Sequence, residues 1–388
     1  MTTPEAKSTA ITIDGSHPFR EHRARFECAN GVITRIEDLP RERDEHDERR
    51  ERDLVLPGLI DLQVNGFAGV DVMTCDESAF HAMTASLARR GTTAFLPTLI
   101  STPLDAMEER IVALTEWLTR IPDGAARPLG LHLEGPFLAK SKRGAHPSDG
   151  VSEARPESLE RLLDAGRGSV RLVTLAPELH GADVLIDLCI ERGVVVSLGH
   201  SDATFDEAAR AVERGARMCT HFGNAMRAFH HREPGLTGAV LALPELSACV
   251  IPDGIHVHDA VLEILHRTKG SRGVILVSDA IAAADLDDGT YRLANTEVTV
   301  EDGVCRNADG VLAGSSLRLV DGILHYARVT GAGNRELADV SSANAAHLLG
   351  LTDRDLTEGS RADLIRLVRQ DSTWILDRTI VGGVEVRP

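Results

Sequence analysis

Four apolar segments of the chain end in a residue that can bind a metal ion or move a proton. The segments are LGLHLE at Glu134, VVVSLGH at His200, RMCTHF with His221, and GVILVSDA with Asp279. A carboxylate at the end of a buried strand is costly unless it is paired, hydrogen-bonded or holding a metal. One carboxylate and two imidazoles suit zinc or a similar divalent cation with one position left for water. We therefore predict that Glu134, His200 and His221 are metal ligands.

Asp279 is the predicted general base and acid. A divalent cation would lower the pKa of a water molecule toward ~7 and polarise a carbonyl oxygen. Hydrolysis also needs a group that takes a proton from this water and returns it to the leaving group. Asp279, at the end of the last of these segments, is placed for that task. The structural alternative is an aspartate that caps the following helix.

These residues need a framework that brings strand ends together. From residue 54 onward, short apolar runs alternate with amphipathic stretches, a pattern typical of a parallel sheet covered by helices. The candidate strands are 54–64, 92–100, 129–134, 171–177, 194–200, 217–222, 247–253 and 273–280. Eight such units favour an α/β fold with a closed (β/α)₈ TIM barrel, whose C-terminal strand ends form one active face. An open sheet is the alternative, but no GxGxxG follows the first strand.

The two ends of the chain show a different, alternating β pattern. We predict a small β domain that combines residues 1–53 with residues 346–388, around a metal-dependent hydrolase barrel over residues 54–345. The stretch 41–53, RERDEHDERRERD, mixes both signs of charge and is predicted to be a solvated loop.

Composition excludes several classes of partner. The formal net charge of −17 argues against nucleic acid and against an anionic membrane surface. No stretch approaches the ~18 apolar residues of a membrane span, and the first residues lack the pattern of a signal peptide. The six cysteines form no CxxC pair, which fits reduced thiols. We expect a soluble, cytoplasmic protein that binds neither nucleic acid nor membranes.

A series of motifs resembles a known family. PGLIDLQVNGFAG, LHLEGPF, SLGHSDAT, THFGNAM, REPGL, DGIHV, VSDA and LAGSSL occur in this order. Together they resemble the N-acetylglucosamine-6-phosphate deacetylases of the amidohydrolase superfamily, from about residue 54 to the end. The resemblance implies a TIM barrel with a small β-sandwich and a homodimer. It also implies hydrolysis of the acetamido group of N-acetylglucosamine 6-phosphate to glucosamine 6-phosphate and acetate, in amino-sugar catabolism and recycling.

The resemblance also implies roles for individual residues. Glu134, His200 and His221 match the family's metal ligands. Asp279 matches its catalytic acid/base. His256 resembles the histidine that contacts the sugar and helps to polarise the acetyl carbonyl. Arg232 is implied to reach the phosphate, in part across the dimer interface, so that its region lies near the partner's active site. The other implied substrate contacts are His146, Asn224, Ala225, Leu312, Ala313 and Gly314.

One position departs from a common superfamily pattern. Many amidohydrolases carry His-x-His on the first strand and thereby complete a second metal site, whereas this chain has Gln63 and Asn65 there. Amides are poor zinc ligands beside imidazole, so we predict one divalent ion per subunit. Zinc is the predicted ion, with Fe²⁺, Co²⁺ and Mn²⁺ as alternatives.

Basic residues follow two of the predicted ligand strands. Lys140, Lys142 and Arg143 come after the Glu134 strand, and Arg232 comes after the His221 strand, where a phosphate would need cationic donors. For the lysines, plain surface charge is the alternative. The substrate could also be N-acetylgalactosamine 6-phosphate or another N-acyl compound. A barrel that had lost catalysis and become a scaffold would show broken ligands, and these are intact.

Overall fold

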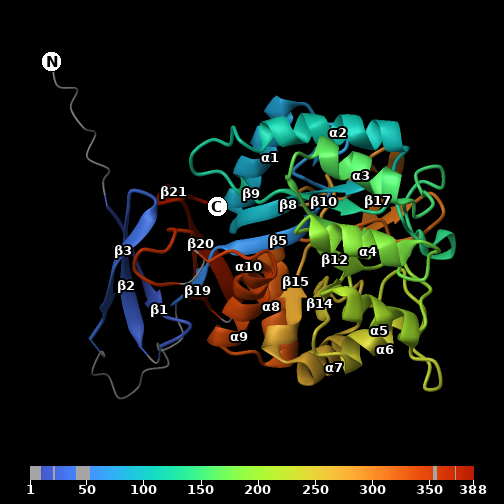
Figure 1. The fold of residues 1–388 in the computed structure, drawn as a ribbon. Helices are drawn as coiled ribbons and strands as arrows, with labels where there is room; N and C mark the ends of the chain where they lie inside the picture. Colours follow the sequence, from blue (N-terminus) through green and yellow to red (C-terminus); the bar gives the residue numbers. More distant parts are fainter. Residues whose placement is uncertain (1–9, 21, 41–52, 353–355, 372) are drawn as a thin grey trace.

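The protein is built around a parallel barrel, seen in a computed structural model that describes residues 10–20, 22–40, 53–352, 356–371 and 373–388 (Figure 1). The barrel strands are β5 (Leu59–Val64), β8 (Thr92–Ile100), β10 (Leu131–Glu134), β11 (Val170–Leu175), β12 (Val195–Leu198), β13 (Met218–Cys219), β14 (Ser247–Val250) and β15 (Val274–Leu276). Each strand pairs with the next in this order. A parallel bridge between Val64 and Ala280 joins the first strand to the segment after the last. The predicted TIM barrel is confirmed.

Eight helices follow the eight strands and cover the outside of the barrel (Figure 1). They are α1 (Glu77–Arg89), α2 (Leu104–Trp117), α3 (Pro156–Ala165), α4 (Ala182–Glu191), α5 (Phe205–Arg214), α6 (Gly235–Ala242), α7 (Asp259–Lys269) and α8 (Leu319–Thr330). Local sequence explains where they begin. Asp76 caps α1, and Thr204 with Glu207 forms a capping box that starts α5 directly after the His200 segment.

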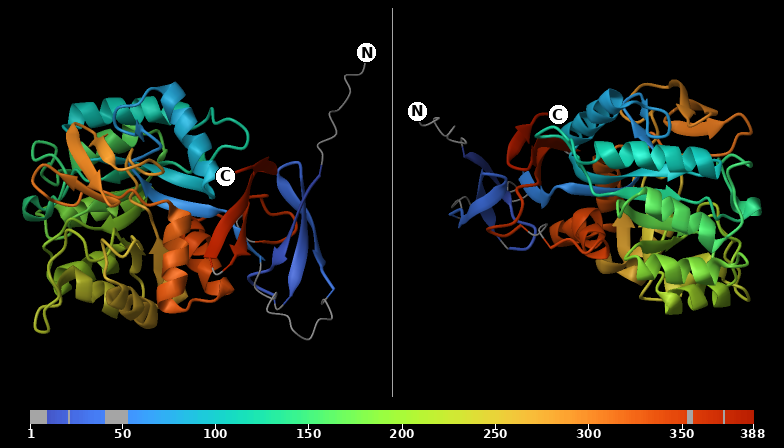
Figure 2. Two further views of the ribbon diagram at one scale, coloured as in Figure 1. Left: turned by 180° about the vertical axis from the view of Figure 1, so that it is seen from behind. Right: turned by 45° about the horizontal axis from the view of Figure 1, so that its top comes forward.

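The two chain ends form a separate sheet beside the barrel (Figure 2). Its strands, in spatial order, are β21 (Val384–Val386), β20 (Thr373–Val381), β19 (Leu364–Gln370), β4 (Asp53–Pro57), β1 (Ile11–Ser16), β2 (Arg23–Ala29) and β3 (Val32–Asp38). Asp53 on β4 accepts hydrogen bonds from Arg23 and Arg366, and so ties the N-terminal strands to the C-terminal ones. The residue boundaries that we predict between the two parts stay a prediction.

The predicted first barrel strand, 54–64, is in fact two strands. β4 pairs with β1 and β19 in the end sheet, and only β5 belongs to the barrel. The chain changes sheets at Gly58, where a Cβ atom would lie 2.2 Å from Oγ1 of Thr93. A side chain would therefore collide with β8 at this crossing. Residues 41–52 of the charged stretch 41–53 lie outside the described residues, and Asp53 is not in a solvated loop but is buried at the start of β4.

Several smaller elements complete the fold. An antiparallel sheet of β16 (Gly289–Leu293), β17 (Thr296–Glu301) and β18 (Val304–Asn307) is inserted between β15 and α8 (Figure 2). The short strands are β6 (Gly66–Phe67), β7 (Val70–Asp71) and β9 (Arg127–Pro128). The remaining helical segments are η2 (Lys140–Lys142), η3 (Ser271–Gly273), α9 (Asn334–Ala338), η4 (Asp339–Ala343) and α10 (Asn344–Leu348).

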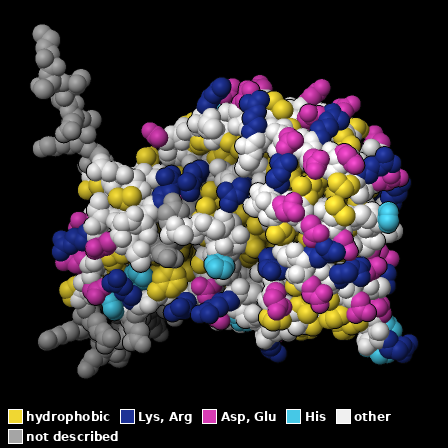
Figure 3. All heavy atoms as spheres, in the orientation of Figure 1, with side chains coloured by type: hydrophobic (Ala, Val, Ile, Leu, Met, Phe, Trp, Pro, Cys, Tyr) yellow, Lys and Arg dark blue, Asp and Glu magenta, His cyan; other side chains and the backbone are white. Residues whose placement is uncertain are grey.

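Burial separates an apolar barrel interior from a charged exterior. Ile60, Leu62, Leu96, Leu172 and Met218 belong to the apolar cluster inside the barrel, and a larger cluster lies between strands and helices. Acidic and basic side chains are intermixed over the face shown in Figure 3. Within the described residues, no helix has the length and apolar character needed to cross a membrane. All six cysteines are free thiols, and five of them are buried.

Candidate active site

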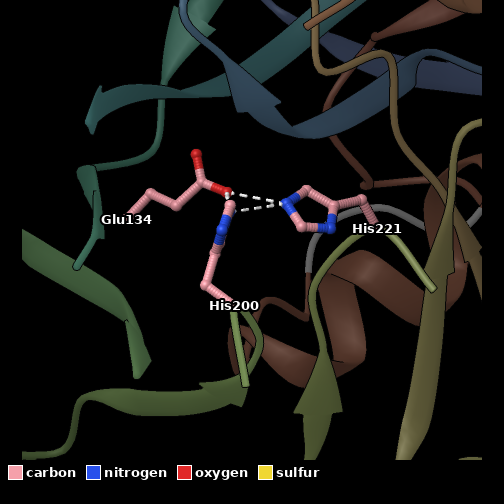
Figure 4. Close-up of side chains that lie close together, drawn as sticks. All are labelled: Glu134, His200 and His221. Carbon is pink, nitrogen blue, oxygen red and sulfur yellow. Dashed lines mark hydrogen bonds and ion pairs between the residues drawn. The ribbon is translucent and has the colours of Figure 1, made fainter. Parts of the chain in front are cut away.

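The three predicted metal ligands meet at the C-terminal face of the barrel (Figure 4). Oε1 of Glu134 lies 3.0 Å from Nε2 of His200 and 2.9 Å from Nε2 of His221. The two imidazole nitrogens are themselves 3.0 Å apart. Three ligand atoms that each lie about 2.0–2.2 Å from one ion have similar spacings, so this donor set fits a borderline divalent cation such as zinc.

The strands end earlier than the sequence pattern predicts, and the functional side chains lie just beyond them. β12 ends at Leu198 and β13 at Cys219, two residues before His200 and His221. His200, His221 and Asp279 all have positive φ, at 49°, 29° and 51°. Left-handed backbone in a non-glycine residue costs about 1–3 kcal/mol and persists only where the surroundings impose it. The fold holds all three residues in this conformation at one face.

The two histidines are oriented differently. Nδ1 of His200 donates to the backbone oxygen of Lys142 across 2.9 Å, which leaves Nε2 directed at the cluster. Nδ1 of His221 is buried and makes no hydrogen bond to another residue in the described parts of the chain. Burial opposes ionisation of Glu134, but hydrogen bonds from the two imidazoles outweigh it and hold the pKa of this carboxyl well below its usual range. Glu134 is therefore an anion at neutral pH.

Asp279 lies beside this cluster and is held by two amides. Nδ2 of Asn65 donates to Oδ1 of Asp279 across 2.7 Å, and Nε2 of Gln63 donates to the same oxygen across 3.0 Å. Nε2 of Gln63 also lies 3.0 Å from Oε1 of Glu134. Burial, and then the charge of Glu134, raise the pKa of Asp279 to about 7. A carboxyl with this pKa can both accept and return a proton near neutral pH.

Two further histidines have fixed orientations in the site. Nδ1 of His256 donates to Oδ2 of Asp253 across 2.6 Å, while the other Asp253 oxygen accepts the His256 backbone N–H. Nδ1 of His146 accepts the backbone N–H of Ser101 across 3.2 Å, and its Nε2 lies 3.7 Å from Oε2 of Glu134. Burial lowers the pKa of His146 to about 3, so that this ring is neutral.

A cavity of about 400 Å³ opens above the cluster. Among the predicted site residues, its walls include Glu134, His146, His200, His221, Asn224, Ala225, His256, Asp279, Leu312 and Gly314. Lys142 also lines it, together with Leu293 from the inserted sheet. Ala313 does not line the cavity; its side chain is buried in an apolar cluster under the inserted sheet.

Arg232 lies outside this cavity. It is exposed in the loop between β13 and α6, which projects from the barrel in Figure 1, and its guanidinium donates to Nε2 of His231. Phe229 and His230 in the same loop are also exposed. The single chain therefore does not place Arg232 in the wall of the cavity.

Sequence reasoning undervalued several residues at the site. Gln63 and Asn65 were noted only as a departure from His-x-His, yet their amides hold Asp279. Glu178 was missed: its carboxylate accepts hydrogen bonds from Oγ of Ser201 and the backbone N–H of Asp202, and so fixes the loop after His200. A carboxylate three residues after the end of strand β11 was the available signal for Glu178.

The chain matches a known protein family over most of its length. The amidohydrolase family model matches residues 54–386. The chain is 36% identical over 330 residues to an N-acetylglucosamine-6-phosphate deacetylase of Lysinibacillus sphaericus, covering 85% of this chain and 84% of that protein. It is 34% identical over 349 residues to an N-acetylgalactosamine-6-phosphate deacetylase of Escherichia coli O157:H7, covering 89% and 90%.

Solved structures agree with the sequence matches. The N-acetylglucosamine-6-phosphate deacetylase of Thermotoga maritima superposes with a TM-score of 0.87 at 33% identity, covering 97% of this chain and 100% of that one. An Asp-to-Ala variant of the Mycobacterium smegmatis enzyme, in complex with N-acetylglucosamine 6-phosphate, superposes with a TM-score of 0.88 at 27% identity, covering 99% and 100%.

The barrel, the donor cluster and the family match together define the class of the protein: it is a hydrolase of the amidohydrolase family. Within that family it belongs to the N-acetylglucosamine-6-phosphate deacetylases, as the identity over most of its length shows.

Proposed function

We propose that the protein hydrolyses the acetamido group of N-acetylglucosamine 6-phosphate, releasing acetate and glucosamine 6-phosphate. The observation that carries the proposal is that Asp279 and the donors Glu134, His200 and His221 line one cavity. The deacetylase relatives, including the Mycobacterium smegmatis protein in complex with this sugar phosphate, support the choice of substrate. The cavity, at about 400 Å³, lies in the range of small-molecule sites.

We assign one divalent ion, zinc, to Glu134, His200 and His221. When bound, the ion supplies Lewis acidity, which lowers the pKa of water and polarises the acetyl oxygen. Asp279 takes the proton of the attacking water and returns it to the nitrogen of the amino sugar as the C–N bond breaks. The Asn65 and Gln63 amides occupy its Oδ1, which leaves Oδ2 for the proton. Zinc is chosen over Fe²⁺, Co²⁺ and Mn²⁺ because two imidazoles and one carboxylate are a common catalytic zinc set.

We assign the surrounding polar groups to substrate orientation. His256, fixed through Nδ1 by Asp253, presents its other nitrogen for the acetyl oxygen or a sugar hydroxyl. Both amide hydrogens of Asn224 are directed at backbone oxygens of its own loop, so its Oδ1 is the atom available to accept a sugar hydroxyl. His146 lies against Glu134 at the wall of the cavity. Leu312 and Gly314 also line the cavity.

A phosphate group needs cationic partners. Among the described residues, Lys142 is the lysine or arginine that lines the cavity. Arg232 lies outside it, in a projecting loop with His230 and His231. We propose that the protein is a homodimer in which this loop reaches the partner's cavity and places Arg232 on the phosphate. A guanidinium recognises phosphate by paired N–H donors, which makes it suited to this role.

A second candidate substrate is N-acetylgalactosamine 6-phosphate, because one relative of similar identity is a deacetylase of that name. The two sugars differ in the orientation of one hydroxyl group. Either sugar could therefore bind in the same cavity. We also propose that the enzyme works in the cytoplasm, where its six free thiols would stay reduced.

The test is kcat/KM for three substrates with zinc supplied: N-acetylglucosamine 6-phosphate, N-acetylgalactosamine 6-phosphate and unphosphorylated N-acetylglucosamine. We expect the first to be the best substrate and the third to be the worst. A preference for the galactosamine derivative would replace the substrate and keep the chemistry. Equal turnover with and without phosphate would remove the phosphate site. No release of acetate from any of the three would refute the proposed function.

A further inference from the structure

A chain of hydrogen bonds crosses the interior of the barrel directly beneath the cluster. Oγ of Ser197 lies 2.5 Å from Oγ1 of Thr220, which lies 2.7 Å from Oγ1 of Thr174. Oγ1 of Thr174 lies 2.8 Å from Nε2 of His132, whose Nδ1 lies 3.1 Å from the backbone oxygen of Leu62. All four polar side chains belong to fully buried residues. The chain spans β12, β13, β11, β10 and β5.

The donors and acceptors of this chain run in one direction. Nδ1 of His132 lies near the backbone oxygen of Leu62 and, at 3.3 Å, near Oγ1 of Thr98. A carbonyl oxygen can only accept, so Nδ1–H donates to Leu62, and in the neutral ring Nε2 is then an acceptor. The hydroxyl of Thr174 therefore donates to His132 and accepts from Thr220, which accepts from Ser197. A chain with every member satisfied in a low-dielectric interior holds its side chains in one arrangement.

The chain contacts the backbone next to each of the three donors of the cluster. Thr220 directly precedes His221, and His132 lies two residues before Glu134 on the same inward face of β10. Gly199 precedes His200, and a Cβ atom there would lie 3.0 Å from both Cγ2 of Thr174 and Cβ of Thr220. Gly199 therefore packs directly against the Thr174–Thr220 pair, where a side chain would be crowded.

His221 depends most on this support. Metal-ligating histidines usually donate their second ring N–H to an oxygen that orients the ring. His200 has such a partner in the Lys142 carbonyl, whereas Nδ1 of His221 has no partner in another described residue. The position of His221 is instead set through its backbone, which follows the anchored Thr220.

We propose that this buried chain positions the metal ligands, with Thr174 as its central positioning residue. The inference rests on the proposed metal centre and adds residues that touch neither ion nor substrate. Thr174→Val keeps the shape of the side chain and removes the hydroxyl, which interrupts the chain between His132 and Thr220. Loss of an outer-shell partner typically weakens metal binding about 10–100-fold. Because Thr174 acts through the backbone, we expect the lower end of that range.

The experiment measures the zinc dissociation constant of the full-length protein by competition with a chelator. Thr93→Val is the matched control, because Thr93 is equally buried on β8 but lies at the N-terminal end of that strand, away from the cluster. Thr174→Ser keeps the hydroxyl and is the rescue variant. We expect the dissociation constant to rise about tenfold in Thr174→Val and to change less than threefold in Thr174→Ser and Thr93→Val.

Two results would overturn the inference. Equal affinity in Thr174→Val and Thr93→Val would show that the hydroxyl has no positioning role. A loss in Thr174→Ser as large as in Thr174→Val would attribute the effect to packing of the methyl group. Should Thr174→Val fail to fold, Ser197→Ala removes the first donor of the chain and is judged by the same criterion. A wild-type protein that takes up no divalent ion would refute the metal centre itself, a result distinct from these two.

Discussion

Nδ2 of Asn65 donates a hydrogen bond to Oδ1 of Asp279 across 2.7 Å, linking the first strand end of the barrel to the last. The bond fixes which oxygen of Asp279 is already occupied. It also gives the amide of Asn65 a task at this strand end, which is to hold a carboxylate. Several testable consequences concern this carboxylate and the cluster beside it.

Replacing Asp279 by Asn should strongly reduce turnover while leaving the metal site filled. General acid–base catalysis contributes about 10²–10⁴-fold, so we expect kcat to fall by about that factor. The substitution keeps the size of the side chain but removes the group that carries the proton. Metal content per subunit, measured on the purified variant, should equal that of the wild type. A variant with wild-type kcat would exclude Asp279 as the base.

The pH dependence of kcat/KM should show an acid limb due to Asp279. Burial and the charge of Glu134 raise the pKa of Asp279 to about 7 in the protein alone, and a bound cation shifts it downward. A base works only when unprotonated, so activity is retained above this pKa and falls about tenfold per unit below it. We therefore expect the limb at or below about pH 7. A rate that rises as the pH falls through this range would contradict the assignment.

Removing the metal should abolish activity and destabilise the fold. A ligand present at about 1,000 times its dissociation constant adds about 4 kcal/mol to the free energy of unfolding. Dialysis against a chelator should therefore lower the melting temperature, and added zinc should restore both stability and turnover. Glu134→Gln, which removes the carboxylate of the cluster, should show little response to zinc in the same assay. Full activity after complete removal of metal would refute the proposed mechanism.

Mixed dimers test whether Arg232 acts on the partner's cavity. Asp279→Asn and Arg232→Ala subunits should each form weakly active dimers. In a mixed dimer, the subunit with intact Asp279 receives Arg232 from its partner, so one site is complete. Equal mixing should then restore activity at about a quarter of the sites, because half of the dimers are mixed. The control is each variant mixed with itself. No recovery would place Arg232 outside the partner's cavity.

The end sheet should respond to acid through His17. Burial, and then the charge of Arg20, lower the pKa of His17 to about 4 from an ordinary 6.5. As the pH falls, His17 therefore binds a proton in the unfolded chain before it does so in the folded protein. The stability that comes from keeping His17 neutral is complete above pH 6.5 and is lost as the pH falls toward about 4. The loss amounts to about 3 kcal/mol.

His17→Asn is the variant that isolates this effect. Nδ1 of His17 accepts the backbone N–H of Phe19 across 3.1 Å, and the asparagine oxygen can accept the same bond. The free energy of unfolding, measured by denaturant titration between about pH 4 and 7, should fall less steeply in the variant than in the wild type. Parallel slopes for the two proteins would show that His17 titrates normally.

Much of the architecture follows from the sequence alone. The alternation of apolar runs with amphipathic stretches predicts a parallel barrel. This alternation can be read from the sequence because each pattern depends only on residues that are close together along the chain. Such a barrel gathers its C-terminal strand ends on one face, so Glu134, His200, His221 and Asp279 could be expected to converge before any coordinates were known. The structure does bring them together.

The tertiary structure alone decided how that face is assembled. The pairing of Gln63 and Asn65 with Asp279 joins residues more than 200 positions apart and depends on closure of the barrel. The chain from Ser197 to His132 depends on the register of four neighbouring strands, which no local pattern encodes. The sequence determined which residues stand at strand ends, because that is a local property. Their partners were set by the distances between strands, and these arise only when the barrel closes.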